Sequence, residues 1–305
     1  MRALLVLAAF AGCNTNDPFD CKTSDQCRLG TSTGTCEPSG FCSFTDAACD
    51  SGRRYDPSAS GDLSGACVPV PDGDHDGIGD ADDNCPSTFN PMQENEDGDP
   101  YGDACDPCPA FAEPMPPADS DNDGITDLCD SHIDATKPDR IVLFEGFHHG
   151  VPNGWTLPAT WTVTGDAMVF PGDGSVTLPI PASSGGVYLS AGLHLTSVPA
   201  SDARVGLALA GMRCDLEQIS GVQSLVLRAG TGGLISSAAY AFTAPHDYVL
   251  VAAWDRDQGF GCFVADATNP SSMIVGSHAP INVNFGFVDL GTIAGALTYV
   301  MIVAQ

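Results

Sequence analysis

Short apolar and alternating runs, separated by Gly, Pro, Asp and Ser, fill the chain from about residue 140 to its end. No run keeps the 3.6-residue period of an amphipathic helix, so we expect few helices. Many short runs at close spacing are typical of a β-sandwich or jelly roll. The pattern predicts a mainly β protein with roughly a dozen antiparallel strands in residues 140–305. The clearest runs lie at 141–147, 159–165, 186–195, 203–211, 224–230, 247–255, 260–267 and 296–305.

Residues 21–70 have a different pattern, with few large apolar side chains among Gly, Ser and Thr. Such a segment buries little core and depends on disulfides. The sequence does not choose among the possible pairings. A zinc site is disfavoured, because no His lies between the cysteines and paired CxxC spacings are absent. Residues 41–68 resemble a small Cys-rich module of predicted secreted bacterial proteins. The six cysteines are Cys21, Cys27, Cys36, Cys42, Cys49 and Cys67.

The negative charge is concentrated in residues 71–139. This segment holds 17 Asp, 3 Glu and one Lys, and so carries −19 of the net charge of −28. Binding nucleic acid needs Lys and Arg, and the whole chain has 11 of them, so nucleic acid is excluded as a partner. An acidic block is commonly a disordered, solvated tail. Here, however, the acids recur at fixed spacing.

Three windows of twelve residues align within this segment, at 72–83, 95–106 and 119–130. Each has Asp or Asn at positions 1, 3, 5, 9 and 12, which with the position 7 carbonyl is the ligand spacing of an EF-hand loop. Calcium takes six to eight oxygen ligands, which alternate side chains of a tight loop can supply. The sequence predicts Ca²⁺ as a cofactor, bound by Asp72, Asp74, Asp76, Ile78, Asp80 and Asp83, by Asn95, Asp97, Asp99, Tyr101, Asp103 and Asp106, and by Asp119, Asp121, Asp123, Ile125, Asp127 and Asp130.

The second window departs from the pattern at position 6. Gly77 and Gly124 supply the glycine that a sharp turn needs, whereas the second window has Pro100. We therefore expect its loop geometry to differ. Without metal the windows would repel themselves, because two unit charges 4 Å apart repel by about 4 kcal/mol at an effective dielectric near 20. We expect the ion to act as the core and folding to be coupled to its binding.

No helical stretch flanks the windows, so they are not EF-hands. The linker DNCPSTFNPMQENED at 83–97, together with GDACD, resembles thrombospondin type 3 repeats over residues 72–130. The resemblance implies a compact, irregular structure that wraps around calcium ions and shares carboxylates between neighbouring ions. It also implies pairing of successive cysteines, as Cys85–Cys105 and Cys108–Cys129. Residues 110–118 interrupt the repeat and are expected to form a stiff, proline-rich arm.

The ends of the C-terminal segment carry a second resemblance. FEGFHHGVPNGW at 144–155 and NFGFVDLGTIAGALTYVMIV at 284–303 resemble the concanavalin A-like, laminin G-type jelly roll. That fold occurs in lectins, adhesion modules and glycoside hydrolases, so the resemblance alone does not settle function. Cys214 and Cys262 fall in predicted strands and are expected to pair. In the chain-entropy model, closing that loop contributes up to about 4 kcal/mol.

Catalysis is not expected from this domain. Glycoside hydrolases need two carboxylates across the scissile bond, and the domain has only Glu145 and Glu217 as glutamates, without the ExDxE strand of the hydrolase branch. Asp255 and Asp257 are more typical of a solvated turn. No GxSxG, HExxH, P-loop or dinucleotide motif occurs. The paired histidines are metal ligands or, in the preferred interpretation, an exposed loop pair; the tryptophans are sugar-stacking or, preferably, core residues. These residues are His148, His149, Trp155, Trp161 and Trp254.

The N-terminus has the layout of an export signal. One Arg precedes an apolar run from residue 3 to residue 11, which is too short to span a bilayer as a helix. The ending FAGC resembles a bacterial lipobox, in which the cysteine is diacylated and becomes the mature N-terminus. This implies a signal peptide at 1–12, lipid on Cys13 and a tether at 13–20. An ordinary signal peptide cut nearby is the alternative.

The expected order is anchor, tether at 13–20, Cys-rich module at 21–70, calcium-binding repeats at 71–139 and sandwich at 140–305. This order predicts a lipoprotein at the outer membrane or cell surface of a bacterium, whose calcium-stiffened stalk presents the sandwich for adhesion or for a glycan or protein ligand. A secreted protein is the alternative localisation. A lectin proper is the alternative function, and a glycoside hydrolase is a less favoured one.

Overall fold

The computed structural model describes residues 20–113, 116–130, 138–172, 174–179, 185–209, 211–230, 232–256, 259–266, 272–275, 285–289 and 293–305. The chain divides into two compact units, Met1–Pro91 and Met92–Gln305. The first predicted calcium window therefore belongs to the first unit, and the other two belong to the second. The predicted signal peptide and the lipid anchor at Cys13 lie outside the described residues.

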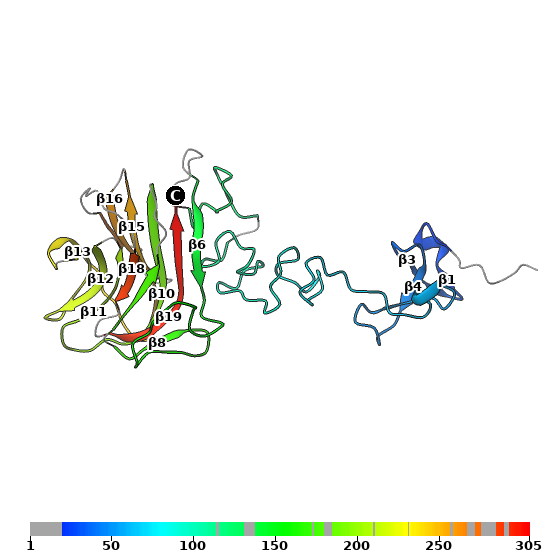
Figure 1. Ribbon diagram of the computed structural model, residues 1–305, viewed down its shortest axis with the longest axis horizontal. Helices are drawn as coiled ribbons and strands as arrows, with labels where there is room; N and C mark the ends of the chain where they lie inside the picture. The colour runs from blue at the N-terminus through cyan, green and yellow to red at the C-terminus, as the bar shows by residue number, and fades with distance from the viewer. Residues whose placement is uncertain are drawn as a thin grey trace, which may run out of the picture. The chain divides into compact units, whose positions relative to one another are not determined.

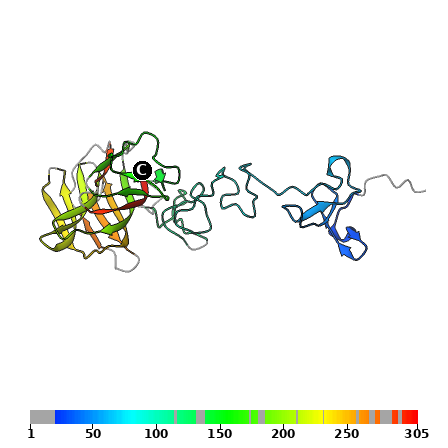
Figure 2. The ribbon, with the colours of Figure 1, turned by 90° about the horizontal axis from the view of Figure 1, so that it is seen from below.

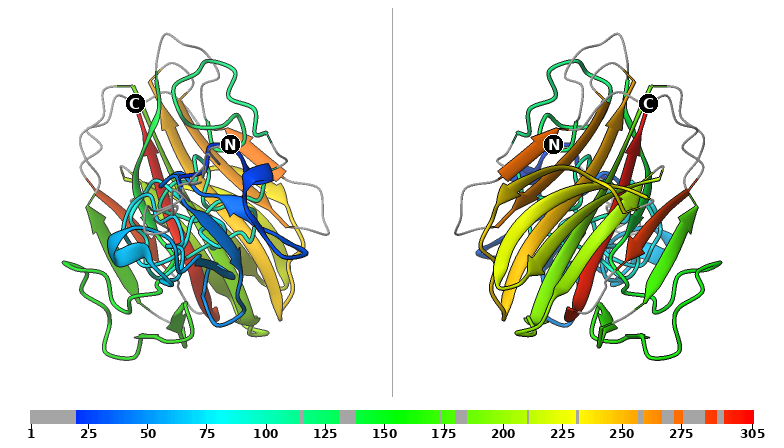
Figure 3. Two further views of the ribbon diagram at one scale, coloured as in Figure 1. Left: turned by 90° about the vertical axis from the view of Figure 1, so that its right-hand side faces the viewer. Right: turned by 90° about the vertical axis from the view of Figure 1, so that its left-hand side faces the viewer.

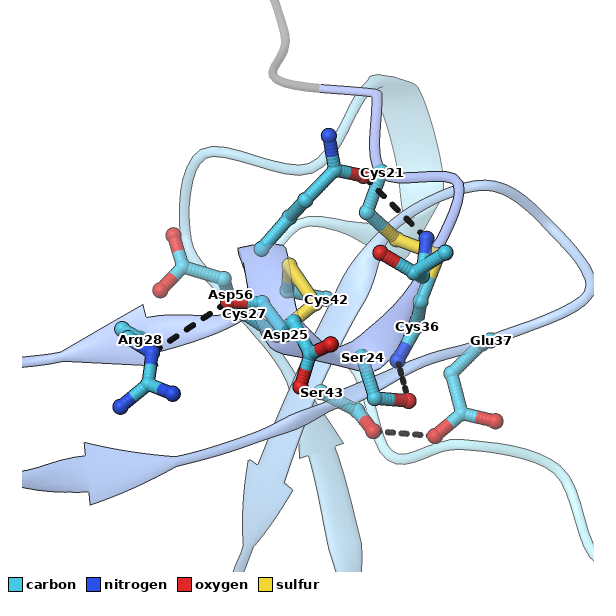
Figure 4. Close-up of a disulfide and its surroundings, with 12 residues drawn as sticks. Cys21, Ser24, Asp25, Cys27, Arg28, Cys36, Glu37, Cys42, Ser43 and Asp56 are labelled. Carbon is cyan, nitrogen blue, oxygen red and sulfur yellow. Dashed lines mark hydrogen bonds between the residues drawn. A yellow bond between two sulfur atoms is a disulfide. The ribbon is translucent and has the colours of Figure 1, made fainter.

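Disulfides replace a hydrophobic core in the Cys-rich module. They join Cys21 to Cys36, Cys27 to Cys42 and Cys49 to Cys67. Figure 4 shows the first two disulfides lying close together. The module has two 3-10 turns, η1 (Ser24–Gln26) and η2 (Gly61–Leu63), a ribbon of β1 (Arg28–Leu29) and β2 (Ser32–Thr33), and a small sheet of β3 (Thr35–Cys36), β4 (Cys42–Thr45) and β5 (Arg53–Tyr55).

Polar contacts, some of them exposed and others part-buried, complete the packing of this module. Ser24 Oγ accepts a hydrogen bond from the Cys36 amide at 3.1 Å, and the Ser43 hydroxyl donates to the Glu37 carboxylate (Figure 4). The Arg53 guanidinium bonds to Glu37 at 3.0 Å. Ser43 is fully buried, so these bonds satisfy polar groups that the disulfides draw inside.

Two antiparallel sheets form the sandwich, and this confirms the predicted fold class (Figure 1). Figures 2 and 3 show the two sheets as layers seen from other directions. The eight-stranded sheet has the order β17 (Ser272–Val275), β16 (Gly259–Ala265), β15 (His246–Asp255), β10 (Gly186–Ser197), β19 (Ala294–Ala304), β8 (Met168–Phe170) and β7 (Thr162–Val163), with β6 (Arg140–Glu145) also paired to β19. The six-stranded sheet has the order β14 (Leu234–Ala239), β13 (Val222–Ala229), β12 (Met212–Ile219), β11 (Ala203–Leu209), β18 (Phe285–Asp289) and β9 (Ser175–Pro179).

The sandwich core follows from the two-residue period of strands. On β19, Val300 and Ile302 point into the main core together with residues of the six-stranded sheet. The disulfide from Cys214 on β12 to Cys262 on β16 joins the two sheets inside this core. All three tryptophans are buried in the sandwich, so core packing is the correct interpretation of Trp155, Trp161 and Trp254. Among the described residues, no helix has the length and apolar character needed to cross a membrane.

The opposite side of β19 is also buried, because residues between 110 and 129 of the calcium segment pack on it. Tyr299, Met301 and Val303 form a second apolar cluster with Ile125 of the third window. Phe111 lies edge-on to the ring of Tyr299, with centroids 6.2 Å apart. Figure 1 shows this irregular segment beside β6. Ala110 and Phe111 were expected in a stiff arm, but they contact this cluster instead.

The cluster makes a testable prediction about how the third window is held. Ile125 is 4% exposed, so Ile125→Ala leaves a cavity and should lower the free energy of unfolding by about 2–3 kcal/mol. Urea unfolding in calcium, followed by tryptophan fluorescence, measures this. Leu128 lies in the same window but is 55% exposed, so Leu128→Ala is the matched control, with an expected change within about 0.5 kcal/mol. Equal effects of the two changes would contradict the packing described.

Candidate metal centre

The three windows share one hydrogen-bonded loop, with positions counted from 1 to 12. In each, the position 3 carboxylate accepts the position 5 amide and the position 5 carboxylate accepts the position 7 amide. These distances are 3.2 and 2.8 Å in the first window, 3.0 and 2.7 Å in the second, and 3.2 and 2.9 Å in the third. The residues are Asp74, Asp76 and Ile78; Asp97, Asp99 and Tyr101; and Asp121, Asp123 and Ile125.

A left-handed backbone at position 4 turns each loop. The φ angles are 65° at His75, 76° at Gly98 and 62° at Asn122. Glycine is free to adopt this conformation, and Asn and His are among the other residues enriched there. Because three residue types adopt the same angle, the hydrogen-bonded loop and not glycine alone sets it. The sequence pattern does not reveal this left-handed position, because position 4 has a different residue type in each of the three windows.

Asn95 compensates for Pro100 in the second window. In the other two windows the position 1 aspartate accepts two amides, from positions 4 and 6. Proline has no amide hydrogen to donate, so one oxygen suffices. Asn95 Oδ1 accepts the Gly98 amide at 2.7 Å, and its Nδ2 donates to the Asp99 carbonyl at 2.6 Å. The second window thus differs at positions 1 and 6, whereas the hydrogen bonds of positions 3 and 5 are the same as in the other windows.

Position 9 closes each loop. Asp80, Asp103 and Asp127 each accept the position 2 amide through Oδ1, at 2.7, 2.8 and 2.7 Å. Their own amides donate to the carbonyl of the residue just before the window, at 2.9, 2.9 and 2.8 Å. In the third window Asp127 Oδ2 also accepts the Ser120 hydroxyl at 2.7 Å. These aspartates were predicted as calcium ligands. In the structure, their hydrogen bonds join position 9 to the start of the loop.

Position 3 of every window has a carboxylate oxygen that is buried without a hydrogen-bond partner in the described part of the chain. This oxygen is the Oδ2 of Asp74, Asp97 and Asp121. A buried acceptor left unpaired is costly, and its recurrence at one position makes this oxygen the candidate cation ligand of each window. Acidic groups with ligand atoms within 4.8 Å of one another surround each of these oxygens: Asp72, Asp74 and Asp76; Asp97, Asp99 and Asp106; and Asp119, Asp121 and Asp123. All the donors are oxygens, which fits calcium.

Burial also changes the acidity of these groups. It raises the pKa of Asp74, Asp97 and Asp121 above the ordinary value, and neighbouring carboxylates add to the effect. At position 12 burial raises the pKa of Asp106 to about 6. A bound cation favours the ionised form and would reverse these shifts.

Each position 12 aspartate lies within two residues of a disulfide-bonded cysteine. Asp83 Oδ1 accepts the Cys85 amide and Asp106 Oδ1 accepts the Cys108 amide, both at 2.7 Å. A disulfide joins Cys108 to Cys129. Cys85 and Cys105 are both disulfide-bonded, and their mutual pairing stays a prediction. Asp130, at position 12 of the third window, donates its amide to the Thr126 carbonyl at 2.8 Å.

The two glutamates considered for hydrolysis lie on different sheets. Glu145 is on β6 of the eight-stranded sheet, where Oε1 accepts the Phe147 amide at 2.9 Å. Glu217 is on β12 of the other sheet and pairs with Arg228 through two bonds of 2.6 Å. Asp255 is buried at the end of β15, and Asp257 lies outside the described residues.

Besides Glu217, strand β12 carries another buried acid, Asp215, which was not predicted from the sequence. It lies two residues from Glu217 on the same face of the strand. Arg213 binds its carboxylate at 2.8 and 3.0 Å. The alternation of charged and apolar residues in 212–219 is the signal that could have revealed this strand. The expectation that both histidines are exposed was also wrong for His148, whose side chain is 20% exposed, whereas that of His149 is 70% exposed.

No protein-family model matches the chain, and no curated protein matches its sequence. Solved structures do match. The CBM2 module of the evolved Dit of Lactobacillus casei BL23 phage J-1 is 11% identical over 54% of this chain and 96% of that one, with a TM-score of 0.43. Peanut lectin with a 9-residue peptide is 9% identical over 55% and 97%, also at 0.43. A mutant GH43 protein, BlXynB from Bacillus licheniformis, is 11% identical over 53% and 39%, again at 0.43. Similarity at this level carries no argument about ligand or activity.

The raised pKa values predict that calcium binding releases protons in mildly acidic solution. In the metal-free loops some carboxyls, such as Asp106 with its pKa of about 6, still hold protons at pH 6. Calcium lowers their pKa and expels those protons, whereas at pH 8 they are already ionised. Calorimetry in two buffers of different ionisation enthalpy gives the protons released per ion. We expect a measurable release at pH 6 and almost none at pH 8; equal release at both would contradict the assignment.

Proposed function

We propose that the protein is an extracellular calcium-binding protein of a bacterial surface, tethered by lipid on Cys13, whose calcium loops connect a Cys-rich module to a ligand-binding β-sandwich. The observation that carries the calcium assignment is the unpaired, buried Oδ2 at position 3 of all three windows. The resemblance of residues 72–130 to thrombospondin type 3 repeats supports the same assignment.

Calcium would supply what these windows lack. Their described residues contain turns and bends but no strand, and few of their side chains are apolar. Backbone amides bind both oxygens of each position 5 carboxylate but only one oxygen of each position 3 carboxylate, whose Oδ2 is buried within a group of neighbouring acids. A divalent ion there would offset carboxylate repulsion and satisfy these oxygens together.

We infer a binding role for the sandwich, with a glycan or a protein as ligand, and no catalysis. Two features support this proposal. On β12 and β13, two bonds each hold the pairs Arg213–Asp215 and Arg228–Glu217, whose carboxylates are buried and whose arginines are 14% and 25% exposed, so each arginine is held in a fixed position. The carboxylates of Glu145 and Glu217 sit on different sheets, and each already accepts hydrogen bonds from the protein.

Limited proteolysis tests the role of calcium. Because an ion that binds only the folded loop stabilises it in proportion to its excess over Kd, cleavage between residues 72 and 139 should be at least about tenfold faster in EDTA than in millimolar calcium. Asp121→Asn removes charge at the position 3 oxygen and should speed cleavage in the third window even with calcium present.

The control is Asp62→Asn, which changes an exposed aspartate outside the windows and should leave the pattern unchanged. Equal cleavage of the unaltered protein with and without calcium would reject a structural role for the ion. Binding of the sandwich to glycans or proteins would then have to be explained without a calcium-stiffened support.

A further inference from the structure

The third window is fastened to the sandwich at two points. Ile125, at position 7, is 4% exposed and packs against β19 in the second apolar cluster. The amide of Asp139 donates a hydrogen bond to the carboxylate of Asp123 at position 5. Asp139 is buried and directly precedes β6, which pairs with β19. The loop therefore contacts β19 with its side chain at position 7 and the start of β6 with its carboxylate at position 5.

A disulfide and two aromatic rings extend this contact. Cys129 of the third window is bonded to Cys108, which is fully buried. Phe111, three residues after Cys108, lies edge-on to the ring of Tyr299, and Phe144 of β6 is stacked on the same ring. Both pairs of ring centroids are 6.2 Å apart. The covalent link therefore ties the third window to the segment that carries Phe111, and both pack on the same part of the sheet.

The first window has the same loop without this contact. Its hydrogen bonds at positions 3 and 5 match those of the third window, and its position 5 carboxylate likewise accepts a distant amide, from Asn90. Ile78 at position 7 is only half-buried, and it belongs to none of the core clusters that the described residues form. The first window lies in the first unit, whereas the third window and the sandwich lie in the second.

We infer that the third window is a calcium-dependent clasp on the sandwich, so that calcium binding there and folding of the sandwich are coupled. This inference rests on the calcium binding proposed for the windows. Without the ion, Asp121 Oδ2 is a buried acceptor among neighbouring carboxylates that repel it. Opening of the loop would relieve that repulsion, but it would also withdraw Ile125 from the cluster and expose the outer side of β19. Calcium at the first window stabilises its own unit and not the sandwich.

Urea unfolding of the intact, oxidised protein, followed by tryptophan fluorescence with and without calcium, tests the coupling. All three tryptophans are buried in the sandwich, so their fluorescence reports the unfolding of this domain. At calcium 100-fold above Kd, one coupled ion raises the ratio of folded to unfolded sandwich about 100-fold. Asp121→Asn should reduce the calcium-dependent gain by about that factor. Asp74→Asn is the matched control, since it makes the same change at position 3 of the first window, and it should leave the gain within about twofold.

A second variant separates loss of the clasp from loss of the ion. Phe111→Ala leaves every acidic residue in place, so we expect it to bind as many calcium ions as the unaltered protein by calorimetry. It removes a ring from the contact with Tyr299, and its calcium-dependent gain in sandwich stability should fall at least about fivefold, the lower end of usual coupling between sites.

The calcium stoichiometry distinguishes the two ways in which the account can fail. Asp74→Asn and Asp121→Asn should each bind fewer ions than the unaltered protein. If both do so and yet give equal calcium-dependent gains, the coupling is overturned while the proposed calcium binding stands. A calcium-dependent gain in Phe111→Ala equal to that of the unaltered protein would also overturn the coupling. Absence of calcium binding to the unaltered protein would reject the proposed function and, with it, this inference.

Discussion

The calcium segment depends on the repulsion between its carboxylates and on what offsets it. Local hydrogen bonds build each loop, because one oxygen of an aspartate binds a backbone amide two residues on. At position 5 the second oxygen accepts another backbone amide, from 14 to 16 residues further along the chain, whereas at position 3 the second oxygen is buried without a hydrogen-bond partner. The hydrogen bonds that shape the loop thus leave an acceptor that a bound cation would satisfy. A segment with so few apolar residues has no other means of holding that charge together.

The second unit joins the second and third windows to a conventional hydrophobic core. Strand β19 uses one side for the sandwich interior and the other for Ile125 and Phe111. Burying both sides of one strand makes the third window part of the sandwich's own packing. Loss of the ion would therefore affect the sheet surface as well as the loop. The second window makes a further contact with the sandwich, where His148 lies 3.7 Å from the carboxylates of Glu96 and Asp103.

Spacing made the calcium windows and most long strands predictable. Acids at alternate positions and apolar runs of 186–195 or 296–305 are local patterns, and the structure places these runs in β10 and β19. Other features depend on contacts that spacing does not contain. The left-handed position 4 uses His, Gly and Asn in turn, and the pairing of the six N-terminal cysteines depends on how the module folds. His148 looked like an exposed loop residue because its carboxylate neighbours come from about 50 residues earlier.

The most direct test of the calcium assignment is the number of calcium ions that the intact, oxidised protein binds, measured by calorimetry near neutral pH. Each window has its own buried position 3 oxygen and its own group of acids, so at least one ion per window, three in all, is the predicted result. Absence of binding at millimolar calcium would contradict the account and leave the buried carboxylate oxygens without an explanation.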